Sequence, residues 1–215
     1  MNAAWPCAGT AYSTILGNRD AFIKRREASL SNSTMGTETE VKVKIGDPAA
    51  FCRQLSRLRA HPVSERHFED NQLVDYPDSR LRSNGCLLRI RQAMDQATIT
   101  FKGAPRAEGI FKVREELETK LDDGVVALQI LERLGLSVCF RYQKYRQEFL
   151  AREVHVAVDE TPVGNYAEFE GSEEGIRNLA AEMGIAESQF LRASYASLYL
   201  DYCREKGEVP GFMTF

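Results

Sequence analysis

The chain has 215 residues, 43% of them hydrophobic and 27% charged, which is typical of an ordinary soluble globular protein of one or two domains. Its net charge of −3 argues against a general nucleic-acid binder, because such proteins carry an excess of basic side chains. The cysteines are scattered and form no C-x-x-C pair, so we expect reduced thiols in a cytoplasmic protein and no zinc site.

The amino-terminal part of the chain differs from the rest. Residues 1–34 lack the basic start and apolar stretch of a secretory signal, and no apolar run in the chain reaches the roughly 20 residues that cross a bilayer. We expect either that Met35 is the natural start or that residues 1–34 form a poorly ordered extension. The folded domain is then expected over residues 35–204, followed by a loose surface tail at 205–215.

The first regular element is a strand over residues 38–45. Charged and apolar side chains alternate there with period two, so Glu38, Glu40 and Lys42 share one face and Val41 and Val43 the other. Taken alone, this pattern favours a strand with one face on the core and the other in water.

Helices are predicted from capping residues and apolar spacing. Asp47 and Pro48 start a helix that ends at His61-Pro62. A second helix spans about 122–134 with a buried stripe, and two more helices follow near the carboxyl terminus. The stripe is Val126, Ile130, Leu131 and Leu134, and the two late helices are capped by Ser172 and Ser188, the second carrying Tyr195.

The later strands repeat the alternation of the first. Each of the segments 88–91, 98–102, 111–118, 144–146, 154–159 and 166–170 has an aliphatic and a charged face. The charged faces hold Arg89, Arg91, Lys102, Arg114, Glu116, Glu118, Lys144, Arg146, Asp159, Glu168 and Glu170. Spacing alone allows an open sheet with one wet face, or a closed antiparallel barrel with charges lining its bore.

A charged bore would suit a charged ligand. Arginine pairs at alternate strand positions can grip phosphate oxygens bidentately, and glutamate pairs suit Mg²⁺ or Mn²⁺. At Glu38, Glu40 and Lys42 the chain resembles the E-x-E-x-K signature of the CYTH superfamily, the triphosphate tunnel metalloenzymes. L-R-I-R at 88–91, T-F-K-G at 100–103, V-R-E-E-L-E at 113–118, K-Y-R at 144–146, V-D-E at 158–160 and E-F-E at 168–170 follow in family order.

The resemblance covers about residues 37–200 and implies an α+β fold, an eight-stranded antiparallel barrel with helices packed around the outside. It implies that the phosphates are held by Lys42, Arg89, Arg91, Lys102, Arg114, Lys144 and Arg146. It assigns Mg²⁺ or Mn²⁺ to Glu38, Glu40, Glu116, Asp159, Glu168 and Glu170. The catalytic set is expected to be Glu38, Glu40, Lys42, Glu168 and Glu170, with Lys44 and Glu118 left open.

Three functions are compatible with these residues. We place first the metal-dependent hydrolysis of inorganic tripolyphosphate, thiamine triphosphate or a nucleoside triphosphate, because it needs only water and a gripped polyphosphate. The alternatives are a class IV adenylyl cyclase, which makes cyclic AMP and pyrophosphate from ATP, and a non-catalytic polyphosphate-binding module. The expected partner is a small-molecule triphosphate, and a homodimer is left open. Phe68, Tyr76, Arg80 and Arg82 are either contacts for an organic group or packing residues.

Overall fold

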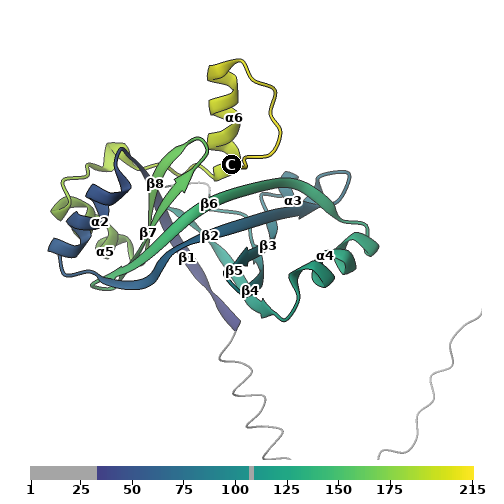
Figure 1. The fold of residues 1–215 in the computed structure, drawn as a ribbon, viewed down its shortest axis with the longest axis horizontal. Coiled ribbons are helices and arrows are strands. Elements are labelled where there is room, and N and C mark those ends of the chain that lie inside the picture. The colour runs from purple at the N-terminus through teal and green to yellow at the C-terminus, as the bar shows by residue number, and fades with distance from the viewer. Residues whose placement is uncertain (1–32, 107–108) are drawn as a thin grey trace, which may run out of the picture. The chain divides into compact units, whose positions relative to one another are not determined.

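The computed structural model describes residues 33–106 and 109–215, shown in Figure 1. Residues 1–32 lie outside the described part of the chain, and so does nearly all of the extension predicted at residues 1–34. In the described part, eight antiparallel strands close into a barrel, which confirms the expected fold class. The strands are β1 (Ser33–Ile45), β2 (His61–Asp75), β3 (Leu87–Ala93), β4 (Gln96–Lys102), β5 (Lys112–Leu121), β6 (Ser137–Ala151), β7 (Val154–Thr161) and β8 (Gly164–Glu170).

Barrel closure follows the order β1-β5-β4-β3-β2-β6-β7-β8, so β1 pairs with both β5 and β8. The described helices are α2 (Pro48–Arg57), α3 (Arg80–Ser83), α4 (Gly124–Arg133), α5 (Glu173–Glu182) and α6 (Tyr195–Lys206), with a 3-10 turn at Glu187–Gln189. None of the helices in this part of the chain is long and apolar enough to span a membrane.

The apolar faces of the strands point outward, under the helices. The largest core cluster joins Val41 of β1 and Phe169 of β8 to Leu55 of α2 and Ile176 and Leu179 of α5. These side chains are almost completely buried, so one side of the barrel is covered by two helices. Because these aliphatic residues face outward, the charged residues that alternate with them face the bore. This decides between the two arrangements that the spacing allowed.

The start of α2 is as predicted, and its end comes earlier. The carboxylate of Asp47 accepts hydrogen bonds from the backbone N–H groups of Ala49 and Ala50, and Pro48 occupies the first turn. The helix ends at Arg57, and Arg59 has a φ of 60°, which breaks the helical path. The expectation that His61-Pro62 ends the helix is wrong, because these residues already begin β2.

The predicted buried stripe of α4 is also wrong. Val126, Ile130 and Leu134 are 48%, 56% and 66% exposed. The helix instead approaches β3 and β4 through Gly124, where a Cβ atom would lie 2.9 Å from the Cβ atom of Ala97. Leu131, the fourth residue of the stripe, is half-buried.

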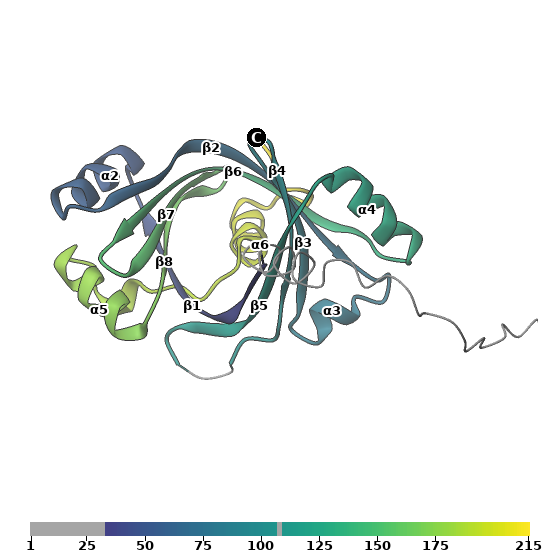
Figure 2. The same ribbon diagram turned by 90° about the horizontal axis from the view of Figure 1, so that it is seen from below.

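The carboxyl-terminal residues are packed against the barrel. Ser194, and not Ser188, caps the last helix, and α6 lies over one end of the barrel in Figures 1 and 2. Most of the residues expected to form a loose surface tail are exposed, but Met213 is completely buried beside Tyr142 and Tyr195. Two backbone hydrogen bonds fix Met213, one of 3.0 Å to the carbonyl of Arg141 and one of 2.9 Å from the N–H of Gln143.

Candidate active site in the barrel bore

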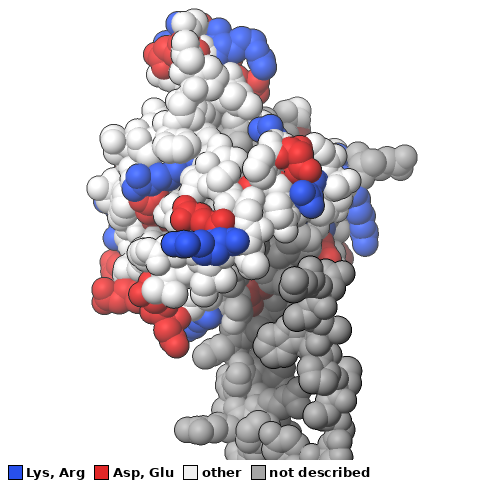
Figure 3. All heavy atoms as spheres, turned by 90° about the vertical axis from the view of Figure 1, so that its right-hand side faces the viewer, with Lys and Arg blue, Asp and Glu red and all other residues white. Residues whose placement is uncertain are grey.

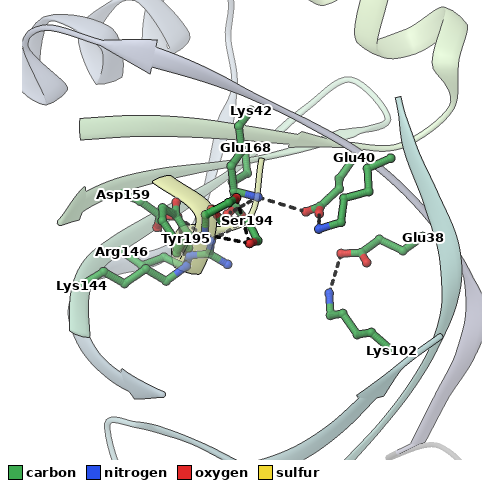
Figure 4. Close-up of polar contacts among 12 residues, drawn as sticks. Glu38, Glu40, Lys42, Lys102, Lys144, Arg146, Asp159, Glu168, Ser194 and Tyr195 are labelled. Atoms are coloured by element: carbon green, nitrogen blue, oxygen red, sulfur yellow. Dashed lines mark hydrogen bonds and ion pairs between the residues drawn. The ribbon is translucent and has the colours of Figure 1, made fainter. Parts of the chain in front are cut away.

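A cavity of about 600 Å³ occupies the bore of the barrel. Twelve of the predicted site residues line it, namely Glu38, Glu40, Lys42, Arg89, Arg91, Lys102, Arg114, Glu116, Lys144, Arg146, Glu168 and Glu170. Asp159 is the exception, because it is completely buried beneath Lys144 and Arg146, with which it pairs. Figure 4 shows carboxylates and cations from different strands pointing toward one another in this space.

The strand register sets opposite charges beside one another. On β1, Glu38 lies directly opposite Arg114 of β5, and Lys42 lies opposite Glu168 of β8. On the next strands around the barrel, Arg146 of β6 lies opposite Asp159 of β7. Cross-strand pairs of opposite charge stabilise a sheet, so the register of the barrel and its internal ion pairs support each other.

Two glutamates of β1 carry most of the pairing on one wall. Lys102 donates a 2.7 Å hydrogen bond to Glu38, and Arg114 donates one of 3.2 Å to its other oxygen. Lys112 donates a 2.8 Å hydrogen bond to Glu40. All these charges are largely removed from water, so each would be costly without its partner.

A second network surrounds Asp159 of β7 and continues through Glu168 to Lys42 of β1. Lys144 donates to Asp159 at 3.0 Å, and Arg146 bridges Asp159 and Glu168 at 2.6 and 2.7 Å. The hydroxyl of Tyr195, at the start of α6, donates to Asp159 as well. The Nζ atoms of Lys42 and Lys144 lie 5.2 and 5.0 Å from the centre of the Tyr195 ring, which adds a cation–π contact.

Arg89 and Arg91 are held by Glu118, the residue that the sequence left open. Arg91 lies 3.2 Å and Arg89 3.4 Å from the Glu118 carboxylate, and Thr100 donates a 2.6 Å hydrogen bond to it. Glu118 therefore orients the two guanidinium groups toward the cavity.

Burial and ion pairing together set the charges of the bore. Burial alone would raise the pKa of Glu40, but Lys42 and Lys112 outweigh it and hold the pKa well below its usual range. Burial alone would lower the pKa of Lys42, but Glu168 and Glu40 outweigh it and raise that pKa. Glu40 and Lys42 therefore both stay ionised at neutral pH.

Glu170 has no such compensation. Burial, reinforced by the charges of Glu38, Glu116 and Glu40, raises its pKa to about 7, although Lys102 opposes the rise. The pKa of Glu116 is raised as well, by burial and by Glu38, against the effect of Lys102. The part of the bore that contains Glu38, Glu116 and Glu170 is called the acidic corner below. It carries more negative charge than Lys102 can balance.

The acidic corner fits a divalent cation in its chemistry. Carboxylate oxygens are the donors that Mg²⁺ and Mn²⁺ prefer, and a cation would relieve the mutual repulsion that raises the pKa values of Glu116 and Glu170. Within the described residues, no three acidic, histidine or cysteine side chains are already arranged as a metal site. Glu38 and Glu40 instead hold lysine and arginine side chains.

One end of the cavity is apolar. Its lining there includes Leu73 of β2, Leu81 of α3, Leu88 of β3 and the sulfur-bearing side chain of Cys139 of β6. Asp75 fixes the loop beneath this end, because its carboxylate accepts hydrogen bonds from the N–H groups of Tyr76, Leu81 and Arg82. The lining at the other end of the cavity contains Glu148, His155 and Glu170. The two ends of the bore therefore differ in polarity.

Lys112 and Tyr195 are site residues that the sequence analysis did not assign to the site. Lys112 has the same strand parity as Arg114 and Glu116, so its position in the strand could have revealed it. Tyr195 gave no such signal, because it comes from a helix and reaches the bore only through the packing of α6. Of the side chains considered for an organic group, Arg82 lines the cavity, whereas Arg80 stacks on Tyr76 and Phe68 packs on Tyr145.

Comparisons with known proteins agree with this architecture. The family model described as CYTH domain matches residues 36–190. A Methanocaldococcus jannaschii protein with the provisional name adenylate cyclase is 28% identical over 173 residues, which are 75% of this chain and 97% of that protein. A solved Vibrio parahaemolyticus structure, also provisionally named an adenylate cyclase, has a TM-score of 0.64 at 24% identity and covers 75% of this chain and 96% of its own. A Hippeastrum protein, provisionally named an adenylyl cyclase and described as having a dominant triphosphatase activity, has a TM-score of 0.57 at 17% identity and covers 80% of this chain and 97% of its own.

Proposed function

Because the chain belongs to the CYTH domain family, we propose that it hydrolyses a triphosphate in the barrel bore with the help of Mg²⁺ or Mn²⁺. The observation that carries the proposal is the meeting of basic and acidic side chains from different strands in one cavity. A site of cations alone would bind polyphosphate, and the added carboxylates supply the groups that hydrolysis needs.

The basic residues would grip the phosphate oxygens. Arg89 and Arg91, held by Glu118, present two planar donors to one part of the cavity, while Lys42, Lys102, Arg114, Lys144 and Arg146 surround the rest. Such a ring of positive charge holds the phosphate chain in line and balances the charge that develops as a P–O bond breaks.

The internal ion pairs would exchange when the substrate enters. Lys102 lies 2.7 Å from both Glu38 and Glu116, so a phosphate oxygen can replace a carboxylate as the partner of this lysine. This exchange would release Glu38 and Glu116, and a similar exchange at Lys112 would release Glu40. With Glu168, Glu170 and Asp159, these three carboxylates form the donor set proposed to hold the metal. The bound metal would neutralise phosphate charge. Glu40, Glu168 or Glu170 would orient the attacking water.

A second candidate function is the adenylyl cyclase reaction, in which the 3′-hydroxyl of ATP attacks its own α-phosphorus and pyrophosphate leaves. The observation in its favour is the apolar end of the cavity around Leu73, Leu81 and Leu88, which offers an organic group a dry surface beside the arginines. The same surface favours an organic triphosphate over inorganic tripolyphosphate in the hydrolytic reaction.

We place the protein in the cytoplasm, where its four described cysteines would stay reduced.

One experiment separates these functions. Purified full-length protein is incubated with tripolyphosphate, thiamine triphosphate or ATP, each with Mg²⁺ or Mn²⁺, and the products are quantified. Release of orthophosphate supports the triphosphatase, and cyclic AMP as the main product from ATP would replace it with the cyclase. Binding of all three compounds without turnover would leave a polyphosphate-binding module.

A further inference from the structure

Helix α4 carries an apolar stripe that no described residue covers. Val126, Ile130 and Leu134 are spaced by four residues, so they lie on one side of the helix, and each has about half or more of its surface exposed. The face of the molecule that carries α4 is turned toward the viewer in Figure 3, where uncharged surface is interrupted by small groups of charge. Exposed aliphatic residues in a row of this kind are typical of an interaction surface.

The two ends of the stripe have opposite charges. Asp122 lies just before the helix, at its amino end, and Arg133 is the last residue of the helix, at its carboxyl end. Both charged side chains belong to exposed residues, and neither takes part in an ion pair among those that join described residues. The surface therefore runs from an acidic end through an apolar centre to a basic end.

We propose that the α4 stripe is the interface of a homodimer, in which α4 packs antiparallel on α4 of a second copy. A twofold axis near position 128 would set Val126 against Ile130 of the partner subunit and the reverse. The same axis would bring Arg133 to the acidic end of the other helix, where Asp122 and Asp123 lie. The order of charges along the stripe is self-complementary only in this antiparallel arrangement.

The area of the stripe predicts a weak dimer. Stable interfaces bury about 800 Å² on each partner, and a short helix contributes only part of that area. Met94, 66% exposed in the turn that joins β3 to β4, the two strands that α4 contacts, would extend the contact. We therefore expect a reversible dimer that forms at micromolar concentration and leaves the bore open, because α4 contributes no residue to the cavity lining.

The test is sedimentation velocity of the full chain from about 1 to about 200 µM. The mass is expected to rise toward twice that of one chain, and Ile130→Glu is expected to weaken the dimer at least about tenfold. Leu200→Glu is the matched control, because it places the same charge on an exposed aliphatic position of another helix, α6. Circular dichroism verifies that each variant is folded.

Charge reversal identifies the arrangement. Arg133→Glu and Asp122→Arg should each weaken the dimer, and the double variant should restore it. A monomer at every concentration, or a dimer that Ile130→Glu leaves unchanged, would overturn the proposal.

A photo-crosslinker at Gln129 is expected to join two chains. A crosslink within one chain to residues 1–32 would mean that this segment covers the stripe, and it would also refute the dimer.

Discussion

The hydroxyl of Tyr195 donates a 2.5 Å hydrogen bond to the carboxylate of Asp159, and neither residue is exposed to solvent. Tyr195 begins α6, whereas Asp159 lies on β7 among the cations of the bore. This bond therefore joins the helix at the end of the barrel to the network of Lys144 and Arg146. Replacing the hydroxyl should affect the bore and the terminal segment together.

The variant Tyr195→Phe should lower the free energy of unfolding by about 1–3 kcal/mol, because a buried carboxylate loses a hydrogen-bond donor. If Tyr195 also positions Lys42 and Lys144, KM for the triphosphate should rise more than kcat falls. Urea denaturation and steady-state kinetics measure the two effects. Tyr202→Phe, on the same helix, serves as the control, and an equal loss of stability there would contradict the role of the Asp159 bond.

The variant Glu38→Gln should lower metal-dependent kcat/KM by about 100-fold while preserving the fold, because the amide keeps the size and loses the charge that a metal requires. Glu115→Gln is the matched control, since Glu115 is exposed and lies outside the cavity lining. Activity assays across a Mg²⁺ or Mn²⁺ titration check the prediction. Unchanged activity in Glu38→Gln would remove this residue from the metal set.

The variant Arg91→Lys should raise KM about tenfold, because lysine cannot make the planar contacts by which arginine reaches both Glu118 and a phosphate. Arg66→Lys is the comparison, since Arg66 pairs with Glu160 at 2.7 Å and is absent from the cavity lining. Both variants are compared by steady-state kinetics on the best triphosphate substrate. Equal effects of the two substitutions would argue against a phosphate contact at Arg91.

Removal of divalent metal with EDTA should stop hydrolysis without unfolding the protein. Glu38 and Glu40 already have lysine and arginine partners in the structure, so their charges remain compensated without a metal. Activity and thermal unfolding are measured on the same chelated sample, and added Mg²⁺ should restore activity. A large fall in the melting temperature on chelation would indicate a structural metal instead.

The stabilisation from Asp75 should depend on pH. Burial would raise the pKa of Asp75, but the backbone N–H groups of Arg82, Leu81 and Tyr76 outweigh it and lower the pKa below its usual value. The folded-state pKa is thus below the unfolded value of about 3.9, so the contribution is present above that pH and is lost as the pH falls through the folded-state pKa. The stability difference between wild type and Asp75→Asn, from urea midpoints, should shrink between about pH 5 and about pH 2. A difference independent of pH would contradict this origin.

The alternation of the strands was readable in the sequence because successive side chains of a strand point to opposite faces. Glu38, Glu40 and Lys42 could be assigned to one face from spacing alone, as could the cations at 89, 91, 144 and 146. The resemblance to a known family then gave the barrel, which the strand order confirms. The roles of these residues in binding and catalysis stay predictions.

Only the tertiary structure decided which charges meet and which surfaces are covered. Lys102 and Glu38 are 64 residues apart in the chain and form a 2.7 Å pair because barrel closure sets the register of their strands. Tyr195 enters the bore, and Met213 is buried, through the docking of the last helix and the residues after it. The stripe of α4 had the spacing of a buried face, yet it lies exposed. Local periodicity determines which side chains share a face, whereas the partner of that face depends on contacts between distant segments.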